Sequence, residues 1–161
     1  KFKISKYDIK NPYFKKLNNN LILVYSGISR TANLIASSYI GKLNTTKKKD
    51  MFELIDLVQE AKNIIKNKNL EEFGDLLHES WALKKSISKN ISTDKIDTIY
   101  DQALKQGAKG GKLLGAGGGG FLLFYVPKEK QKHFLKNLKK IITIKFKFTD
   151  QGSSIIYNSN D

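Results

Sequence analysis

The sequence predicts an α+β fold in which helices cover one face of an antiparallel sheet. Three observations lead to it: an apolar run of strand length near the N-terminus, a central block of helical patterns, and strand patterns toward the C-terminus. Strands and helices do not alternate one by one, so a parallel sheet built from β-α-β units is not indicated. The 161 residues, 40% of them hydrophobic, suffice for one packed domain.

The N-terminal part divides at residue 20. Residues 1–20 are polar and contain turn signals at Asn11–Pro12 and Asn18–Asn20, so we expect a lead-in without an element that has a core of its own. Leu21–Tyr25 is a continuous apolar run and predicts a buried strand. The expected domain therefore spans 21–161.

Apolar residues at helical spacing predict four helices after this strand. Ser29 would cap the first, which ends at Gly41, and residues 51–68 form the second. Asn69 and Glu72 resemble a capping box that opens the third. The fourth begins in Ser92-Thr93-Asp94 and ends at Gly107, a glycine suited to a left-handed cap.

The C-terminal third predicts strands around one further helix. Residues 121–126 form an apolar strand that stops at Pro127, and 128–139 follow an amphipathic helical pattern. Apolar and polar residues alternate over 142–148, which is typical of a half-buried strand. Gly152 would then turn the chain into an antiparallel mate at 154–157.

Composition excludes several classes of function. The chain has no cysteine, so disulfides, thiolate metal sites and a cysteine nucleophile are excluded. No apolar run is long enough to cross a membrane and the first residues do not resemble a signal peptide, so we expect a cytoplasmic protein without a membrane partner. The net charge of +14 comes from dispersed lysines and a single arginine, Arg30, which favours a lysine-rich surface over nucleic-acid binding.

The densest chemical signal is a glycine cluster. Eight of the twelve glycines lie between Gly107 and Gly120. Glycine costs backbone entropy on folding, so such a cluster indicates either positive φ angles or amides that approach a ligand closely. Successive amides of this kind form a concave site for an anion such as phosphate. A tight hairpin that is glycine-rich only for packing is the alternative.

Generic nucleotide motifs do not account for the cluster. A Walker A loop needs a glycine where Gln106 stands and a serine or threonine where Leu113 stands. Gly115–Gly120 satisfies the dinucleotide-binding spacing, but a strand follows it instead of the required helix. The companion motifs of the protein kinases are missing from the sequence.

The segment from Gly107 to Phe121 resembles the third motif of the GHMP kinases, the superfamily of galactokinase, homoserine, mevalonate and phosphomevalonate kinases. The segments 25–30, 78–86 and 152–157 resemble its D-glycero-D-manno-heptose phosphate kinase branch, and the likeness covers about residues 21–157. The resemblance implies a ferredoxin-like C-terminal domain of an ATP-dependent kinase. Its product would feed nucleotide-activated heptose for surface polysaccharide.

The family's ATP-cradling motif, Pro-x-x-x-Gly-Leu-Gly-Ser-Ser-Ala, does not occur in this sequence. By resemblance, that motif, the catalytic aspartate and the Mg²⁺ ligands belong to an N-terminal domain that precedes Lys1. We therefore expect no catalytic and no metal-binding residue here, and a chain that is inactive by itself. Its expected partners are an N-terminal kinase domain and a small-molecule sugar phosphate, with ATP and Mg²⁺ as cofactors.

The resemblance and the motifs together give candidate site residues. The loop that faces ATP would comprise Lys112, Gly115, Ala116, Gly117, Gly118, Gly119 and Gly120, although Lys112 can equally be structural. Substrate-binding candidates are Ser29, Arg30, Thr31, His78 and Trp81. Arg30 binds a sugar phosphate or forms a surface ion pair, whereas a structural role is favoured for His78 and core packing for Trp81.

Two alternatives remain at this stage. One is another GHMP kinase of the fucose or mevalonate type, which only substrate profiling separates from a heptose kinase. The other is a stand-alone basic α+β module that binds RNA or an anion. Gly119-Gly120-Phe121 is the nearest approach to an RNA-binding aromatic motif, and it is a poor match.

Overall fold

The computed structural model describes residues 7–43, 45–155 and 157. It confirms the predicted α+β class, with six α-helices and a four-stranded antiparallel sheet over these residues. The helices are α1 (Pro12–Asn20), α2 (Ala32–Ile40), α3 (Lys48–Asn67), α4 (Leu70–Ile87), α5 (Asp94–Lys105) and α6 (Gln131–Asn137), with short 3₁₀ turns η1 (Lys89–Ile91) and η2 (Lys128–Lys130). The strands are β1 (Leu21–Tyr25), β2 (Gly110–Leu113), β3 (Phe121–Tyr125) and β4 (Thr143–Ile144).

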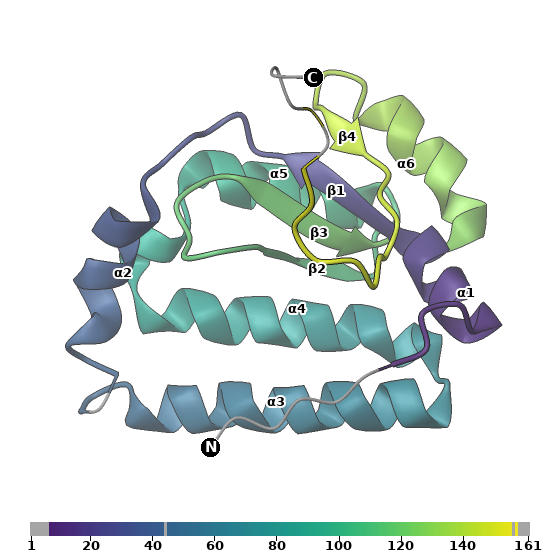
Figure 1. The fold of residues 1–161 in the computed structure, drawn as a ribbon. Helices are drawn as coiled ribbons and strands as arrows, with labels where there is room; N and C mark the ends of the chain where they lie inside the picture. The colour runs from purple at the N-terminus through teal and green to yellow at the C-terminus, as the bar shows by residue number, and fades with distance from the viewer. Residues whose placement is uncertain (1–6, 44, 156, 158–161) are drawn as a thin grey trace.

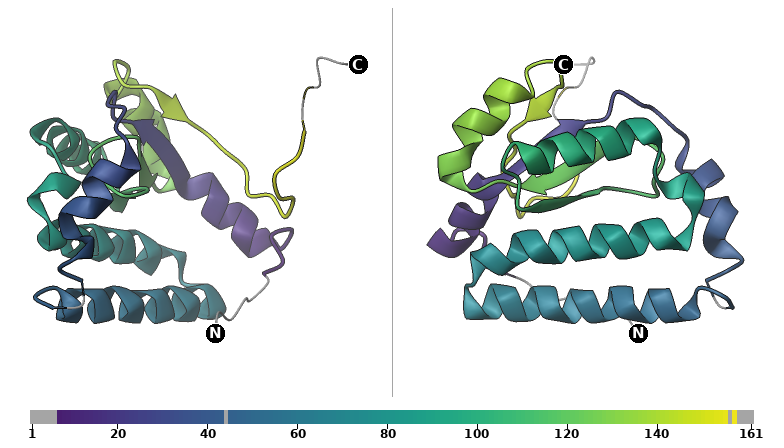
Figure 2. Two further views of the ribbon diagram at one scale, coloured as in Figure 1. Left: turned by 60° about the vertical axis from the view of Figure 1, so that its left-hand side comes forward. Right: turned by 180° about the vertical axis from the view of Figure 1, so that it is seen from behind.

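The sheet has the strand order β2-β3-β1-β4. In the centre, β1 runs antiparallel to β3 with Leu23 opposite Leu123, and the β2–β3 hairpin carries the glycine cluster at its turn. Helix α5 lies behind the strands in Figure 1 and in front of them in the reverse view of Figure 2. Helix α4 runs beside the sheet, and α3 forms an outer layer on α4 (Figure 1).

The main core fills the space between one sheet face and the helices. Alternate strand residues point into it, among them Ile22, Val24, Leu122 and Phe124, and all four are nearly inaccessible. Trp81 of α4, Tyr100 of α5 and Phe134 of α6 are among the helical residues that close this core. The core fixes α4 and the hairpin relative to each other, which positions the glycine loop.

The prediction of an elementless lead-in is wrong for residues 12–20, which form α1. The Asn11 side chain accepts a 2.9 Å hydrogen bond from the Tyr13 amide, and Pro12 occupies the first helical turn. Leu17 is 2% exposed and joins a second core cluster with Leu21 and Tyr125. The polar residues 12–20 thus form a helix that packs on the rest of the domain through Leu17.

The observed elements differ from the predicted ones in three further places. Thr31, not Ser29, is the N-cap residue of α2, and its side chain makes no capping bond. The capping box at α4 does not form: the Asn69 side chain donates to the Glu72 carboxylate at 2.5 Å instead. Strand pairing over 142–148 is confined to β4, and the described residues of 154–157 form no strand, with Ile155 86% exposed.

Candidate functional site

Positive φ angles, one of the two reasons that the sequence suggested, account for part of the glycine loop, and close packing, the alternative interpretation, accounts for another part. The φ angles of Gly115, Gly117, Gly118 and Gly120 are all positive, between 70° and 125°. A Cβ at Gly117 would also lie 2.9 Å from the Ile91 Cα, and one at Gly118 would lie 2.8 Å from the Ile35 Cδ1. The loop is therefore pressed against η1 and α2 at Gly117 and Gly118, whereas a Cβ at Gly115 or Gly120 would have no neighbouring atom within 4 Å.

Only part of the loop offers free backbone donors. The Gly118 amide donates to the Ile91 carbonyl and the Gly120 amide to the Ile28 carbonyl, both at 2.9 Å. Within the described part of the chain, no acceptor contacts the amides of the other four loop residues, Gly115, Ala116, Gly117 and Gly119. The expected anion site is thus limited to these four amides, because the other two bind the protein itself.

The segment 29–31 lies beside this loop. It connects β1 to the N-terminus of α2, and the side chains of Ser29, Arg30 and Thr31 are exposed. A Cβ at Gly118 would lie 3.4 Å from the Arg30 Cδ, so the arginine stem runs along the loop. No described carboxylate is within ion-pair distance of the Arg30 guanidinium. An arginine and free amides together are a common way to bind a phosphate.

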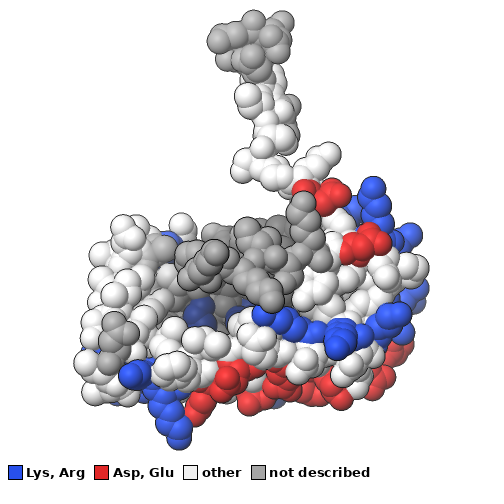
Figure 3. Space-filling model, turned by 60° about the horizontal axis from the view of Figure 1, so that its bottom comes forward, with Lys and Arg blue, Asp and Glu red and all other residues white. Residues whose placement is uncertain are grey.

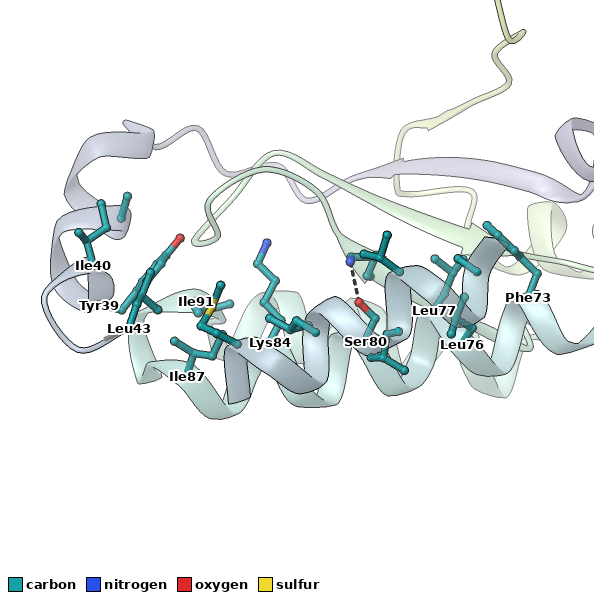
Figure 4. A pocket seen from close by; sticks show the side chains of 17 residues that line it. Tyr39, Ile40, Leu43, Phe73, Leu76, Leu77, Ser80, Lys84, Ile87 and Ile91 are labelled. Atoms are coloured by element: carbon teal, nitrogen blue, oxygen red, sulfur yellow. Dashed lines mark hydrogen bonds between the residues drawn. The ribbon is translucent and has the colours of Figure 1, made fainter. Parts of the chain in front are cut away.

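Two lysines lie near the loop: Lys84 of α4, labelled in Figure 4, and Lys112 of β2. The Lys112 Nζ donates a 2.7 Å hydrogen bond to the Ser80 Oγ, and the Lys84 Nζ donates to the Gly115 carbonyl. Burial lowers the pKa of both lysines, and burial together with the nearby charge of Lys112 lowers the pKa of Lys84 to about 8. Sequence reasoning missed Lys84, although a lysine in register with the apolar face of α4 was the available signal.

The other two substrate candidates lie elsewhere. Trp81 is 1% exposed inside the main core, so it cannot stack on a sugar, and the packing role that the sequence favoured is the observed one. His78 shares a 2.8 Å hydrogen bond with the Tyr100 hydroxyl, which also donates to the Gly111 carbonyl at 3.1 Å. His78 packs beside Gly110, at the end of β2 away from the glycine loop. The structure therefore does not bring it to the loop.

Metal-ligand clusters, helix hydropathy and surface charge are three further properties of the described residues. No group of three or more histidine, aspartate or glutamate side chains within them could hold a metal. None of the described helices is long and apolar enough to cross a membrane. On the face shown in Figure 3, a row of Asp and Glu side chains runs directly beside a band of Lys and Arg side chains.

Comparison with known proteins decides the family. Residues 54–141 match the family described as "GHMP kinases C terminal". The chain belongs to the GHMP kinases. The match includes β2, the glycine loop and β3, which agrees with the resemblance of the glycine motif.

Individual GHMP relatives differ in substrate. The D-glycero-alpha-D-manno-heptose 7-phosphate kinase of Campylobacter jejuni is 34% identical over 89% of this chain. The mevalonate kinase of Methanocaldococcus jannaschii is 37% identical over 83% of the chain. The chain spans 43% of the length of each of these relatives.

Solved GHMP kinase structures share the fold. A crystal structure of the Methanococcus jannaschii mevalonate kinase superposes with a TM-score of 0.69 at 32% identity, covering 86% of this chain and 42% of that one. This chain therefore corresponds to the C-terminal region of a GHMP small-molecule kinase.

Proposed function

We propose that the chain forms the C-terminal half of an ATP-dependent kinase that phosphorylates a heptose phosphate such as D-glycero-D-manno-heptose 7-phosphate. The observation that carries the proposal is the position of Arg30 along a glycine loop whose remaining amides are free. Phosphoryl transfer depends mainly on positioning and on electrostatic stabilisation of phosphate oxygens, which is what these groups can supply. The identity to the Campylobacter jejuni heptose kinase supports the choice of sugar.

The proposal assigns separate tasks to the groups of this chain. The amides of Gly115, Ala116, Gly117 and Gly119 would bind phosphate oxygens of the nucleotide, and Arg30 would bind the phosphate that the sugar already carries. Lys84, by donating to Gly115, would hold the start of the loop in place. ATP, the Mg²⁺ ligands and the catalytic base would be brought by an N-terminal kinase domain. Mg²⁺ supplies charge neutralisation on the transferred phosphoryl group.

A mevalonate kinase is the second candidate, because a mevalonate kinase is about as similar to this chain as the heptose kinase is. The two candidates differ in the anion that Arg30 would meet, a phosphate on a sugar or a carboxylate on a branched acid. A bidentate arginine can bind either anion, so the residue by itself does not separate them.

Substrate profiling separates the two candidates. We would join this chain to the N-terminal half of the Campylobacter jejuni relative and measure ADP release from Mg-ATP with heptose 7-phosphate, fucose or mevalonate. We expect kcat/KM for the heptose phosphate to exceed that for mevalonate by at least about a hundredfold. A site that binds a phosphate and sugar hydroxyls would leave some of its own hydrogen-bonding groups without a partner when mevalonate binds. A preference for mevalonate would contradict the heptose assignment. The unmodified Campylobacter enzyme serves as the control for the assay.

A further inference from the structure

A cavity of about 650 Å³ lies between α2, α3, α4 and β2 (Figure 4). Its walls are almost wholly hydrocarbon. They are formed by Ala36, Tyr39, Ile40, Leu43, Met51, Leu54, Leu57, Val58, Ala61, Phe73, Leu76, Leu77, Ile87 and Ile91. Ile40 and Val58 are 58% and 53% exposed, so apolar side chains also form its mouth.

Few polar groups line this cavity. Besides the Tyr39 hydroxyl, they are Ser80 and Lys84, which lie midway along the cavity wall formed by α4 (Figure 4), and Lys112 of β2, which donates to Ser80. An ammonium group has three donors, and the structure uses one of each lysine, on the Gly115 carbonyl and on the Ser80 hydroxyl. No described carboxylate lies within ion-pair distance of either lysine. Two half-buried cations therefore face the cavity without a counter-charge.

This arrangement is unfavourable unless an anion completes it. Two like charges that share a partly desolvated site repel each other, and burial penalises each of them. Burial lowers the pKa of both lysines, and for Lys84 the nearby charge of Lys112 lowers the pKa further. An anion between them would remove the repulsion and pair the remaining donors, and the apolar walls would bury a hydrocarbon body next to it.

We propose that this cavity binds an amphiphilic anion: a hydrocarbon chain between α2, α3 and α4, with a carboxylate or phosphate head group held by Lys84 and Lys112. A heptose phosphate does not fit this description, because its many hydroxyls would be buried against aliphatic walls without hydrogen-bond partners. The site is therefore distinct from the proposed sugar-phosphate position at Arg30. Its occupation requires no kinase activity.

Binding at this site has a consequence for the glycine loop. A head group on the remaining donors of Lys84 would share the amine with the Gly115 carbonyl, which accepts from the same group. Ligand binding would therefore hold the Lys84 amine, and with it the start of the loop, in place. Such a ligand would thus act on the phosphate loop from a separate site.

The test is direct titration of this chain with decanoate and decyl phosphate, with decanol as the neutral probe. By calorimetry, we expect saturable binding of one anion per chain and at least about tenfold weaker binding of decanol, the loss that follows from removing a charged hydrogen bond. Equal affinities for decanoate and decanol, or no saturable binding of either anion, would overturn the proposal. The comparison of decanoate with decyl phosphate identifies the preferred head group.

Variants locate the binding site. Lys84→Gln and Lys112→Gln should each weaken decanoate binding by about tenfold, whereas Lys89→Gln, on an exposed lysine outside the cavity, should leave it unchanged. Met51→Trp keeps both lysines but fills the cavity, so it should also abolish binding. Circular dichroism checks that each variant folds. Unchanged affinity in a folded Met51→Trp chain would overturn the proposed location.

A pH series provides a readout that needs no substitution. The titratable groups that line the cavity are Lys84 of α4, Lys112 of β2 and Tyr39 of α2, and α3 contributes none. Raising the pH from 7 to 9.5 passes the pKa of about 8 of Lys84, so decanoate affinity should fall. An affinity that stays constant over this range would contradict a role for Lys84 in holding the head group.

Discussion

Gly110→Ala is expected to destabilise the chain by about 3 kcal/mol, the upper part of the range for overpacking a buried site. A Cβ at Gly110 would lie 2.0 Å from the Gly74 carbonyl oxygen and 3.0 Å from the His78 Cβ. Both contacts belong to α4, and two of the three nearest atoms are backbone, so relief requires α4 and β2 to move apart. That movement would loosen the core around Trp81 and the support of the glycine loop.

The matched control is Gly41→Ala. No atom lies within 4 Å of a Cβ at Gly41, and its φ of −62° suits alanine. This substitution should be neutral or stabilise the chain by up to about 1 kcal/mol, because it lowers the entropy of the unfolded state. Urea unfolding followed by circular dichroism measures both variants. Equal midpoints for Gly110→Ala and Gly41→Ala would show that α4 does not approach β2 as closely as described.

Arg30→Ala is expected to lower kcat/KM of the completed kinase for its phosphorylated substrate by on the order of a hundredfold, since it removes a charge-assisted contact to phosphate. The side chain is exposed and has no described ion-pair partner, so the free energy of unfolding should hardly change. Arg30→Lys should restore only part of the rate, because an ammonium lacks the planar fork that binds two oxygens.

The control for this experiment is Lys89→Ala, which removes an exposed positive charge on η1. If Lys89→Ala and Arg30→Ala reduce the rate equally, general surface charge accounts for the effect and the specific role of Arg30 is contradicted. A substrate without a phosphate should lose little activity when Arg30 is replaced. That comparison separates binding of the substrate's phosphate from support of the glycine loop.

The sequence sufficed for the fold class and for the glycine loop because both depend on local signals. Strand-length apolar runs and helical periodicity are local, and the density of glycine indicated positive φ angles, which occur at Gly115, Gly117, Gly118 and Gly120. Helix α1 could have been predicted from Asn11 as a cap with Pro12 after it, a common helix start. The asparagines at 18–20 concealed it, since they favour turns when read alone.

Strand pairing over 142–148 could not be predicted from alternation. Alternation reports that one side of a segment is buried, and Phe146 and Phe148 do pack on the second core cluster. Their backbone instead bonds to a side chain: the Asn18 amide group donates to the Phe146 carbonyl and accepts from the Phe148 amide, both at 2.8 Å. Because Asn18 is so distant in the sequence from Phe146 and Phe148, no local sequence pattern indicates these hydrogen bonds.

In the candidate site, too, some features could be predicted from local sequence and others depend on tertiary contacts. Arg30 and the glycine loop were each recognisable from local sequence, but only the packing of α2 against the β2–β3 hairpin places them side by side. Lys84 became a candidate through its hydrogen bond to Gly115 and its proximity to Lys112, both of which are tertiary contacts. A residue whose role depends on two distant neighbours cannot be assigned from periodicity alone.

The most direct test of the central claim is ADP release from Mg-ATP and heptose 7-phosphate by this chain alone and by the chain joined to a GHMP N-terminal half. We predict no sugar-dependent release by the chain alone, because the ATP-cradling motif of the GHMP kinases does not occur in this sequence, and turnover once the N-terminal half is present. Sugar-dependent turnover by the 161-residue chain itself would contradict the account, since the base and the metal ligands would then have to lie within these residues.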